Sequence, residues 1–213
     1  MNSAPSSLYA AKRAEADFPT KFGHFRILGF EGSARDPETC RPEAAVALTM
    51  GDILAKPPLV RIHSQCLTGD VFHSLRCDCR QQLELALEMI AAAGAGILLY
   101  EQKEGRGIGL IAKLQAYELQ DQGLDTVEAN ERLGFKADHR EFALPAAVLR
   151  AMGITEVRLI SNNPQKVSAL EAAGVRVVER VPCEPIAHER SAGYLRTKRK
   201  KLGHLIGEDG KDD

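Results

Sequence analysis

Hydrophobic residues recur at helix and strand spacings along residues 83–180. Leu83, Leu87 and Ile90 lie at i, i+4 and i+7 and Gly94 follows them, which predicts an amphipathic helix over 83–93. The apolar run at 97–100 predicts a buried strand directly after it. Further along, the same signals predict helices from 110 to Gly123, over 126–133, over 146–152 and from Pro164 to Gly174, and strands over 156–161 and 175–180.

The N-terminal part has the composition of strands. Residues 22–30 are rich in aromatic and β-branched side chains, and a polar, proline-containing connection separates them from the apolar run at 45–50. Residues 1–17 are small and polar without a sustained period, so we expect a mobile arm there. Strands that alternate with helices favour an α/β fold, here a mixed sheet with flanking helices and a β-rich N-terminal part.

The composition is that of a folded chain. Of 213 residues, 44% are hydrophobic and 27% are charged, and the net charge is −1, so no global positive field would attract nucleic acid or an anionic membrane. No apolar run approaches the ~18 residues of a membrane span, and residues 1–20 lack the apolar core of a signal peptide. We therefore expect a cytoplasmic protein that binds neither nucleic acid nor membrane.

Three of the five cysteines, Cys66, Cys77 and Cys79, fall within fourteen residues. The odd number and the expected compartment argue against a disulfide framework. Cys77 and Cys79 can point the same way in an extended or tightly turned segment, with Cys66 approaching from a neighbouring strand. Three thiolates can hold a zinc ion with an open position for catalysis. His63 or His73 can instead complete a closed structural site, and buried thiols without a metal are a third interpretation.

A glycine-rich turn, EGRGIGL at 104–110, follows the predicted strand at 97–100 and opens the next predicted helix. This geometry offers backbone N–H groups and a positive helix end to a phosphate, and Arg106 adds a bidentate donor. The glycine spacing differs from the G-x-G-x-x-G dinucleotide fingerprint, and the sequence contains no P-loop. The turn therefore indicates phosphate binding without identifying the ligand.

Several motifs occur in an order and spacing that resemble one enzyme family. They are RIHSQCLTGDVFHSLRCDCRQQ at 61–82, EGRGIGL at 104–110, the segment at 117–135, ADHR at 137–140 and SNNPQK at 161–166. In these segments the chain is similar to GTP cyclohydrolase II, the zinc enzyme that opens the guanine ring of GTP at the first step of riboflavin synthesis. The resemblance spans 18–206, which we expect to form one domain, with 207–213 as a disordered tail.

The resemblance implies roles for individual residues. The three clustered cysteines would hold zinc, one ion per chain, and Mg²⁺ would accompany the triphosphate. Asp138 matches the family's proton acceptor and Tyr117 an active-site tyrosine. Arg140 matches the residue proposed as nucleophile toward the α-phosphate, although a guanidinium, which stays protonated, also suits electrostatic stabilisation there. The positions that match GTP contacts are Arg61, Ile62, His63, Ser64, Gln65, Gln82, Glu104, Gly105, Arg106, Thr126, Ser161 and Lys166.

The resemblance also implies GTP as substrate, a diaminopyrimidine ribosyl phosphate, formate and pyrophosphate as products, and a homodimer. The departures from the family pattern include Gln65 in place of Glu, and His73 and Arg80 in place of Gly. Two alternatives therefore stay open: an altered paralogue that hydrolyses GTP incompletely, and a non-catalytic module that binds GTP or zinc. The intact cysteines and Asp138 favour the enzyme, because a binding module does not need an open metal position beside a proton acceptor.

Overall fold

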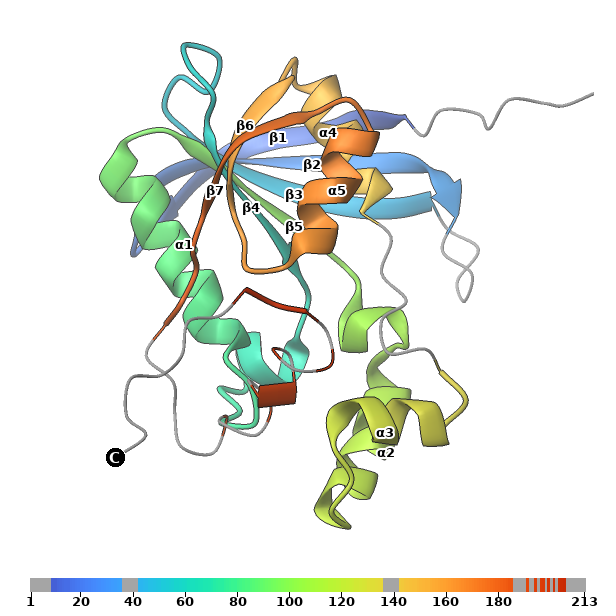
Figure 1. Cartoon of the computed structure of the whole chain (residues 1–213). Helices are drawn as coiled ribbons and strands as arrows, with labels where there is room; N and C mark the ends of the chain where they lie inside the picture. The colour runs from blue at the N-terminus through green and yellow to red at the C-terminus, as the bar shows by residue number, and fades with distance from the viewer. Residues whose placement is uncertain are drawn as a thin grey trace, which may run out of the picture.

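The computed structural model of the chain describes residues 9–35, 42–135, 142–185, 191, 194, 196, 197, 199, 201 and 203–205. Across these residues, seven strands form one sheet in the order β1-β2-β3-β5-β4-β6-β7 (Figure 1). The strands are β1 Ala10–Thr20, β2 Gly23–Arg35, β3 Pro42–Met50, β4 Leu59–Ser64, β5 Gly96–Glu101, β6 Glu156–Ile160 and β7 Arg176–Val181.

The N-terminal strands form the antiparallel part of the sheet. β1 pairs with β2, β2 with β3, and β3 with β5, all antiparallel. The expected mobile arm over 1–17 is wrong for residues 10–17, which belong to β1 and pair with β2 from Ala10 opposite Gly32 onward. Most β1 side chains are exposed, so the segment shows no hydrophobic alternation. The strand is held instead by backbone hydrogen bonds to β2 and by exposed ion pairs.

The remaining strands form the parallel part of the sheet. β5, β4, β6 and β7 run parallel to one another, which makes the sheet mixed and confirms the α/β prediction. The helices in the described part of the chain are α1 Cys79–Ala93, α2 Leu110–Asp121, α3 Thr126–Arg132, α4 Ala143–Ala151 and α5 Pro164–Ala172, with a π-helical turn η1 Leu67–Val71 and a 3₁₀ turn η2 Glu104–Gly107. Each helix predicted from the sequence is present, with ends that differ by a few residues.

Side chains along the central strands alternate between two hydrophobic layers. Val60 and Ile62 of β4 join Ile97 and Leu99 of β5 in one core, against which α4 and α5 pack. Leu98 points to the opposite face of the sheet, which α1 covers. Because the side chains of β4 alternate between these two layers, its apolar residues determine which face of the sheet each of its polar residues points to.

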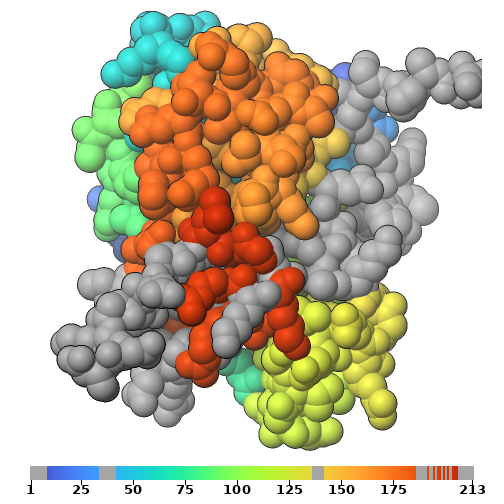
Figure 2. Space-filling model, in the orientation of Figure 1, coloured from blue at the N-terminus to red at the C-terminus, as the bar shows by residue number. Residues whose placement is uncertain are grey.

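The helix pair α2 and α3 lies beyond the carboxyl ends of β4 and β5, below the sheet in Figure 1. Described residues of the C-terminal segment lie between this pair and the main body (Figure 2). Lys201 in that segment forms ion pairs with Asp125 and Glu128 at the start of α3. Within the residues that the structure describes, no helix has the length and apolar character to cross a membrane.

Candidate active site

A cavity lies at the carboxyl ends of β4, β5 and β6, where open α/β sheets bind their ligands. Every predicted site residue that the structure describes lines this cavity except Ile62, whose side chain is fully buried in the core under α4 and α5. The predicted residues on the cavity wall are Arg61, His63, Ser64, Gln65, Cys66, Cys77, Cys79, Gln82, Glu104, Gly105, Arg106, Tyr117, Thr126, Ser161 and Lys166. Asp138 and Arg140 lie outside the described residues.

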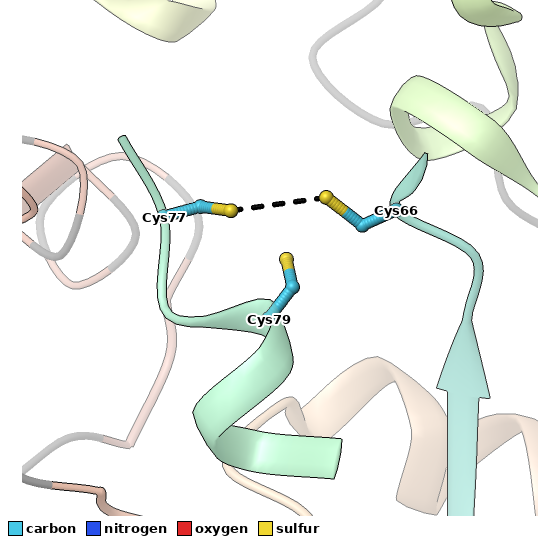
Figure 3. A group of neighbouring side chains, drawn as sticks. All are labelled: Cys66, Cys77 and Cys79. Atoms are coloured by element: carbon cyan, nitrogen blue, oxygen red, sulfur yellow. Dashed lines mark hydrogen bonds between the residues drawn. The ribbon is translucent and has the colours of Figure 1, made fainter. Parts of the chain in front are cut away.

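Cys66, Cys77 and Cys79 point toward one another (Figure 3). Cys66 follows β4, Cys77 lies in the turn before α1, and Cys79 is the first residue of α1. Their Sγ atoms all lie within 4.8 Å of one another, and those of Cys66 and Cys77 are 3.7 Å apart. The prediction that these three thiols meet is confirmed.

The thiol cluster has the space and the chemistry to hold one metal ion. A Cβ atom added to Gly69 would lie 3.0 Å from the Sγ atom of Cys77 and 3.1 Å from that of Cys66, so any other residue would crowd the thiols where η1 passes them. Three thiolates are ligands that zinc prefers. Within the described part of the chain, the group that could ligate a metal includes neither His63 nor His73, which favours the open three-ligand site over the closed one.

The three thiols influence one another's ionisation. Hydrogen bonds from Cys77 and Cys79 lower the pKa of the Cys66 thiol, against the effect of its burial. The hydrogen bond to Cys66 raises the pKa of Cys77 to about 11, and hydrogen bonds to its two neighbours together with burial raise the pKa of Cys79. Cys66 is therefore the first of the three to ionise, and the charge of a bound cation would stabilise the other two thiolates.

Asp70 anchors the loop that follows Cys66. Its carboxylate accepts hydrogen bonds from the backbone N–H of Cys66 at 3.0 Å, from the Tyr100 hydroxyl at 2.9 Å and from His63 Nε2 at 3.2 Å. Burial lowers the pKa of His63, which favours the neutral imidazole. Its Nδ1 atom is buried and has no hydrogen-bond partner among the described residues, and the ring lines the cavity. His63 can therefore present Nδ1 to a ligand.

Lys113 and Glu104 connect the thiol cluster to the glycine-rich turn. Lys113 Nζ donates to Glu104 Oε1 at 2.7 Å, to Thr68 Oγ1 at 2.9 Å and to Cys66 Sγ at 3.2 Å. Glu104 Oε2 accepts from the backbone N–H of Leu67 at 2.6 Å. Burial disfavours the charge of Lys113, but the thiolate of Cys66 and the carboxylate of Glu104 outweigh it and raise the lysine pKa. The Glu104 carboxylate is thus occupied by contacts within the protein.

Sequence reasoning missed three of these residues. Asp70 and Thr68 lie inside the motif at 61–82, so their position beside Cys66 could have marked them. Lys113 gave no signal, because a lysine on an amphipathic helix is usually a surface residue. Thr68 Oγ1 also lies 3.1 Å from the hydroxyl of Tyr117, which brings this predicted tyrosine beside the cluster.

The glycine-rich turn has an unusual backbone. Gly105 and Arg106 adopt left-handed conformations, with φ of 60° and 62°, and for Arg106 this costs about 1–2 kcal/mol. One terminal nitrogen of Arg106, Nη2, is buried without a partner among the described residues, and the guanidinium lies 5.4 Å from the ring centre of Tyr194. α2 begins after Gly109 without a side-chain cap, so its first N–H groups can bind an anion.

Arg61 and Lys166 place two buried cations on the cavity wall. Arg61 Nη1 donates to the carbonyl of Ile160 at 3.1 Å and Nη2 donates to Gln82 Oε1 at 2.5 Å, whereas its Nε is buried without a partner in the described structure. Lys166 Nζ donates to the carbonyl of Ile62 at 2.7 Å, so Ile62 reaches the site through its backbone. These contacts fix both positive charges in position for a polar or anionic ligand.

The departures from the family pattern at Gln65, Arg80 and His73 have distinct surroundings. Gln65 lines the cavity, and its backbone N–H donates to the carbonyl of Glu101. Arg80 donates to the carbonyl of Asp70 at 2.8 Å and to Glu84 at 2.9 Å, so it ties η1 to α1. His73 is exposed and has a left-handed φ of 57°, a conformation that glycine adopts without strain.

Comparisons of the sequence with a family model and with known relatives agree on one family. A family model described as GTP cyclohydrolase II matches residues 11–182. A protein of Proteus mirabilis (strain HI4320) named GTP cyclohydrolase-2 is 54% identical over 194 residues, which covers 91% of this chain and 94% of the relative. A protein of Histophilus somni (strain 2336) with the same name is 53% identical over 194 residues, which covers 91% of this chain and 87% of the relative.

Among solved structures, the two-domain 3,4-dihydroxy-2-butanone 4-phosphate synthase RibBX of A. baumannii matches 82% of this chain and 40% of its own length. The identity is 18% and the TM-score is 0.45. A similarity this distant does not bear on function.

Proposed function

The chain belongs to the GTP cyclohydrolase II family, and we propose that it hydrolyses GTP to a diaminopyrimidine ribosyl phosphate, formate and pyrophosphate, the first step of riboflavin synthesis. One observation carries the proposal: the thiols of Cys66, Cys77 and Cys79 and the turn that holds Arg106 line one cavity. Ring opening of a nucleotide requires a centre that activates water and donors that bind phosphate, within reach of one molecule. A module that only binds GTP would need the donors that bind phosphate but not the centre that activates water.

We assign Cys66, Cys77 and Cys79 as the ligands of one zinc ion per chain. When bound, zinc supplies a Lewis acid that makes water nucleophilic at neutral pH, which suits attack at C8 of guanine. Asp70 holds the backbone of Cys66 in place, and Gly69 leaves room for the thiols where η1 passes them. Tyr117 lies on the cavity wall beside the cluster, where its hydroxyl can exchange a proton with the opening ring.

We assign the triphosphate to the glycine-rich turn. The unpartnered Nη2 of Arg106 and the first N–H groups of α2 are the donors that support this assignment. Mg²⁺ would neutralise the remaining phosphate charge. Asp138 keeps the role of proton acceptor that the resemblance implies. Arg140 would act at the α-phosphate, where a protonated guanidinium stabilises the phosphoryl transition state.

The guanine and ribose are assigned to the part of the cavity lined by β4, β6, α1 and the first turns of α3 and α5. His63 Nδ1 and Arg61 Nε are buried there without partners among the described residues, so they can bond to a polar ring. The polar residues that complete this part of the cavity in the proposal are Ser64, Gln65, Gln82, Thr126, Ser161 and Lys166. A homodimer and a cytoplasmic location stay predictions.

The proposal is tested with purified protein, GTP and Mg²⁺, by following formate, pyrophosphate and the ultraviolet change of ring opening. Stoichiometric release of both products is expected. Release of only one product would identify the altered paralogue. Binding of GTP without either product would identify the non-catalytic module and would refute the proposed activity.

A further inference from the structure

Lys113 has the contacts of a functional residue, although its position on α2 predicts a surface side chain. It is 9% exposed, and a buried ammonium is costly unless acceptors surround it. An ammonium has three N–H donors, and three acceptors lie within 3.2 Å of Nζ: Glu104 Oε1, Thr68 Oγ1 and Cys66 Sγ. Because these acceptors use all three donors, Lys113 has none left for the substrate. Its role must therefore come from the three acceptor groups that it holds in place.

The three acceptors belong to the two halves of the site. Cys66 and Thr68 lie in the segment that follows β4, whereas Glu104 is the first residue of the glycine-rich turn. Glu104 strengthens the connection, because its other oxygen accepts from Leu67 N–H and its Oε1 also accepts from Gly105 N–H at 3.0 Å. Lys113 and Glu104 together therefore fix the distance between the thiol cluster and the phosphate-binding turn.

We propose that Lys113 is a positioning residue of the metal centre, which holds the Cys66 sulfur in its ligating orientation and fastens the thiol cluster to the glycine-rich turn. The inference rests on the proposed function, which makes Cys66 a zinc ligand. An N–H donor on a thiolate withdraws electron density from the sulfur and also fixes the orientation of the sulfur. Removal of a group that orients a metal ligand typically lowers metal affinity about 10–100-fold.

The test replaces Lys113 by Met, which is unbranched and only one atom shorter and which removes the donors. Wild type and Lys113→Met are loaded with Co²⁺, and the sulfur-to-cobalt absorption band is recorded. Loss of the donor raises the energy of the sulfur electrons, so the band should move to longer wavelength. Zinc affinity, measured by competition with a chelator, should fall about 10–100-fold. Circular dichroism verifies that the variant is folded.

Lys21→Met is the matched control. Lys21 is exposed and pairs with Glu84 of α1, the helix that begins at Cys79, but it has no contact with the thiols among its described interactions. This control should keep the wild-type band and affinity. Lys113→Gln retains an amide donor, so its band should lie between those of wild type and Lys113→Met.

The outcomes separate the inference from the proposed function. A wild-type protein that binds neither Co²⁺ nor Zn²⁺ refutes the metal site itself, before any variant is compared. A wild type that binds metal, with an unchanged band and affinity in folded Lys113→Met, overturns the positioning role alone. If Lys113→Met and Lys113→Gln both fail to fold, the lysine serves the fold and the inference is equally overturned.

Discussion

The backbone N–H of Cys66 donates to the carboxylate of Asp70, four residues further along the chain, at 3.0 Å. The same carboxylate accepts from Tyr100 of β5 and from His63 of β4, so it connects the backbone of Cys66 to two central strands. The position of Cys66 thus depends on a buried acceptor that touches no substrate in the proposed mechanism.

Asp70→Ala should destabilise the fold and the thiol cluster together. The change leaves the N–H of Cys66, the His63 ring and the Tyr100 hydroxyl without their acceptor, and one buried unsatisfied donor costs about 1–3 kcal/mol. We expect the free energy of unfolding in urea to fall by about 2–5 kcal/mol. Asp121→Ala is the control, because the exposed pair of Asp121 with Arg76 should contribute less than about 1 kcal/mol. Equal effects of the two changes would contradict the anchoring role of Asp70.

Purified protein should contain about one zinc ion per chain, and Cys77→Ser or Cys79→Ser should lose both the metal and formate release. The reason is that a hydroxyl is a much weaker zinc ligand than a thiolate. Cys183→Ser is the matched control, because Cys183 is buried in the core under α1, outside the thiol group. Elemental analysis decides the matter: full zinc retention in both ligand variants would refute this set of ligands.

Arg140→Ala should abolish pyrophosphate release, whereas a folded Cys77→Ser protein should still be able to release pyrophosphate without opening the ring. This difference follows from the proposal that the arginine acts at the α-phosphate and the metal at the base. Product analysis by chromatography measures both rates. Equal residual rates of both products in the two variants would argue against two separable steps.

The sequence predicted the parts of this site that depend on local spacing. The thiols of Cys77 and Cys79 converge because they lie two residues apart in a turn, and the glycine-rich turn was visible from its position between a strand and a helix. β1 was missed because its side chains are exposed and only its backbone pairing holds it. Lys113 and Asp70 were missed because their partners come from other segments, which no periodicity along the chain reveals.

His73→Gly should make the protein more stable. The left-handed φ of 57° costs an L-residue about 1–2 kcal/mol, and the greater freedom of glycine in the unfolded chain offsets about 0.4–1 kcal/mol of that gain. The His73 side chain is exposed, so its removal should cost little. We expect a net gain of about 0.5–1 kcal/mol in the free energy of unfolding. His73→Val should instead lose more than about 1 kcal/mol, because a β-branched residue tolerates this conformation poorly. Thermal unfolding that ranks valine above glycine would rule out backbone strain at this position.

Gln65→Glu tests the departure that lies nearest the reacting groups. Gln65 lines the cavity one residue before Cys66, so the carboxylate that the family usually has would either accept hydrogen bonds from guanine N–H groups or add negative charge beside the thiols. The amide oxygen of Gln65 can still accept, and the exchange of a charged for a neutral acceptor changes such a bond by ~1 kcal/mol.

We therefore expect the wild type to be active on GTP, and Gln65→Glu to lower KM or raise kcat by no more than about tenfold, which corresponds to ~1.4 kcal/mol. Gln122→Glu, which adds the same charge at an exposed position after α2, should leave the kinetics unchanged. Steady-state formate release measures all three proteins. If the wild type is inert toward GTP and Gln65→Glu restores activity, the interpretation as an active enzyme is wrong and the chain is a specialised paralogue. Unchanged kinetics in Gln65→Glu would show that the amide serves as well as the carboxylate, because acceptance of a hydrogen bond is then all that the position requires.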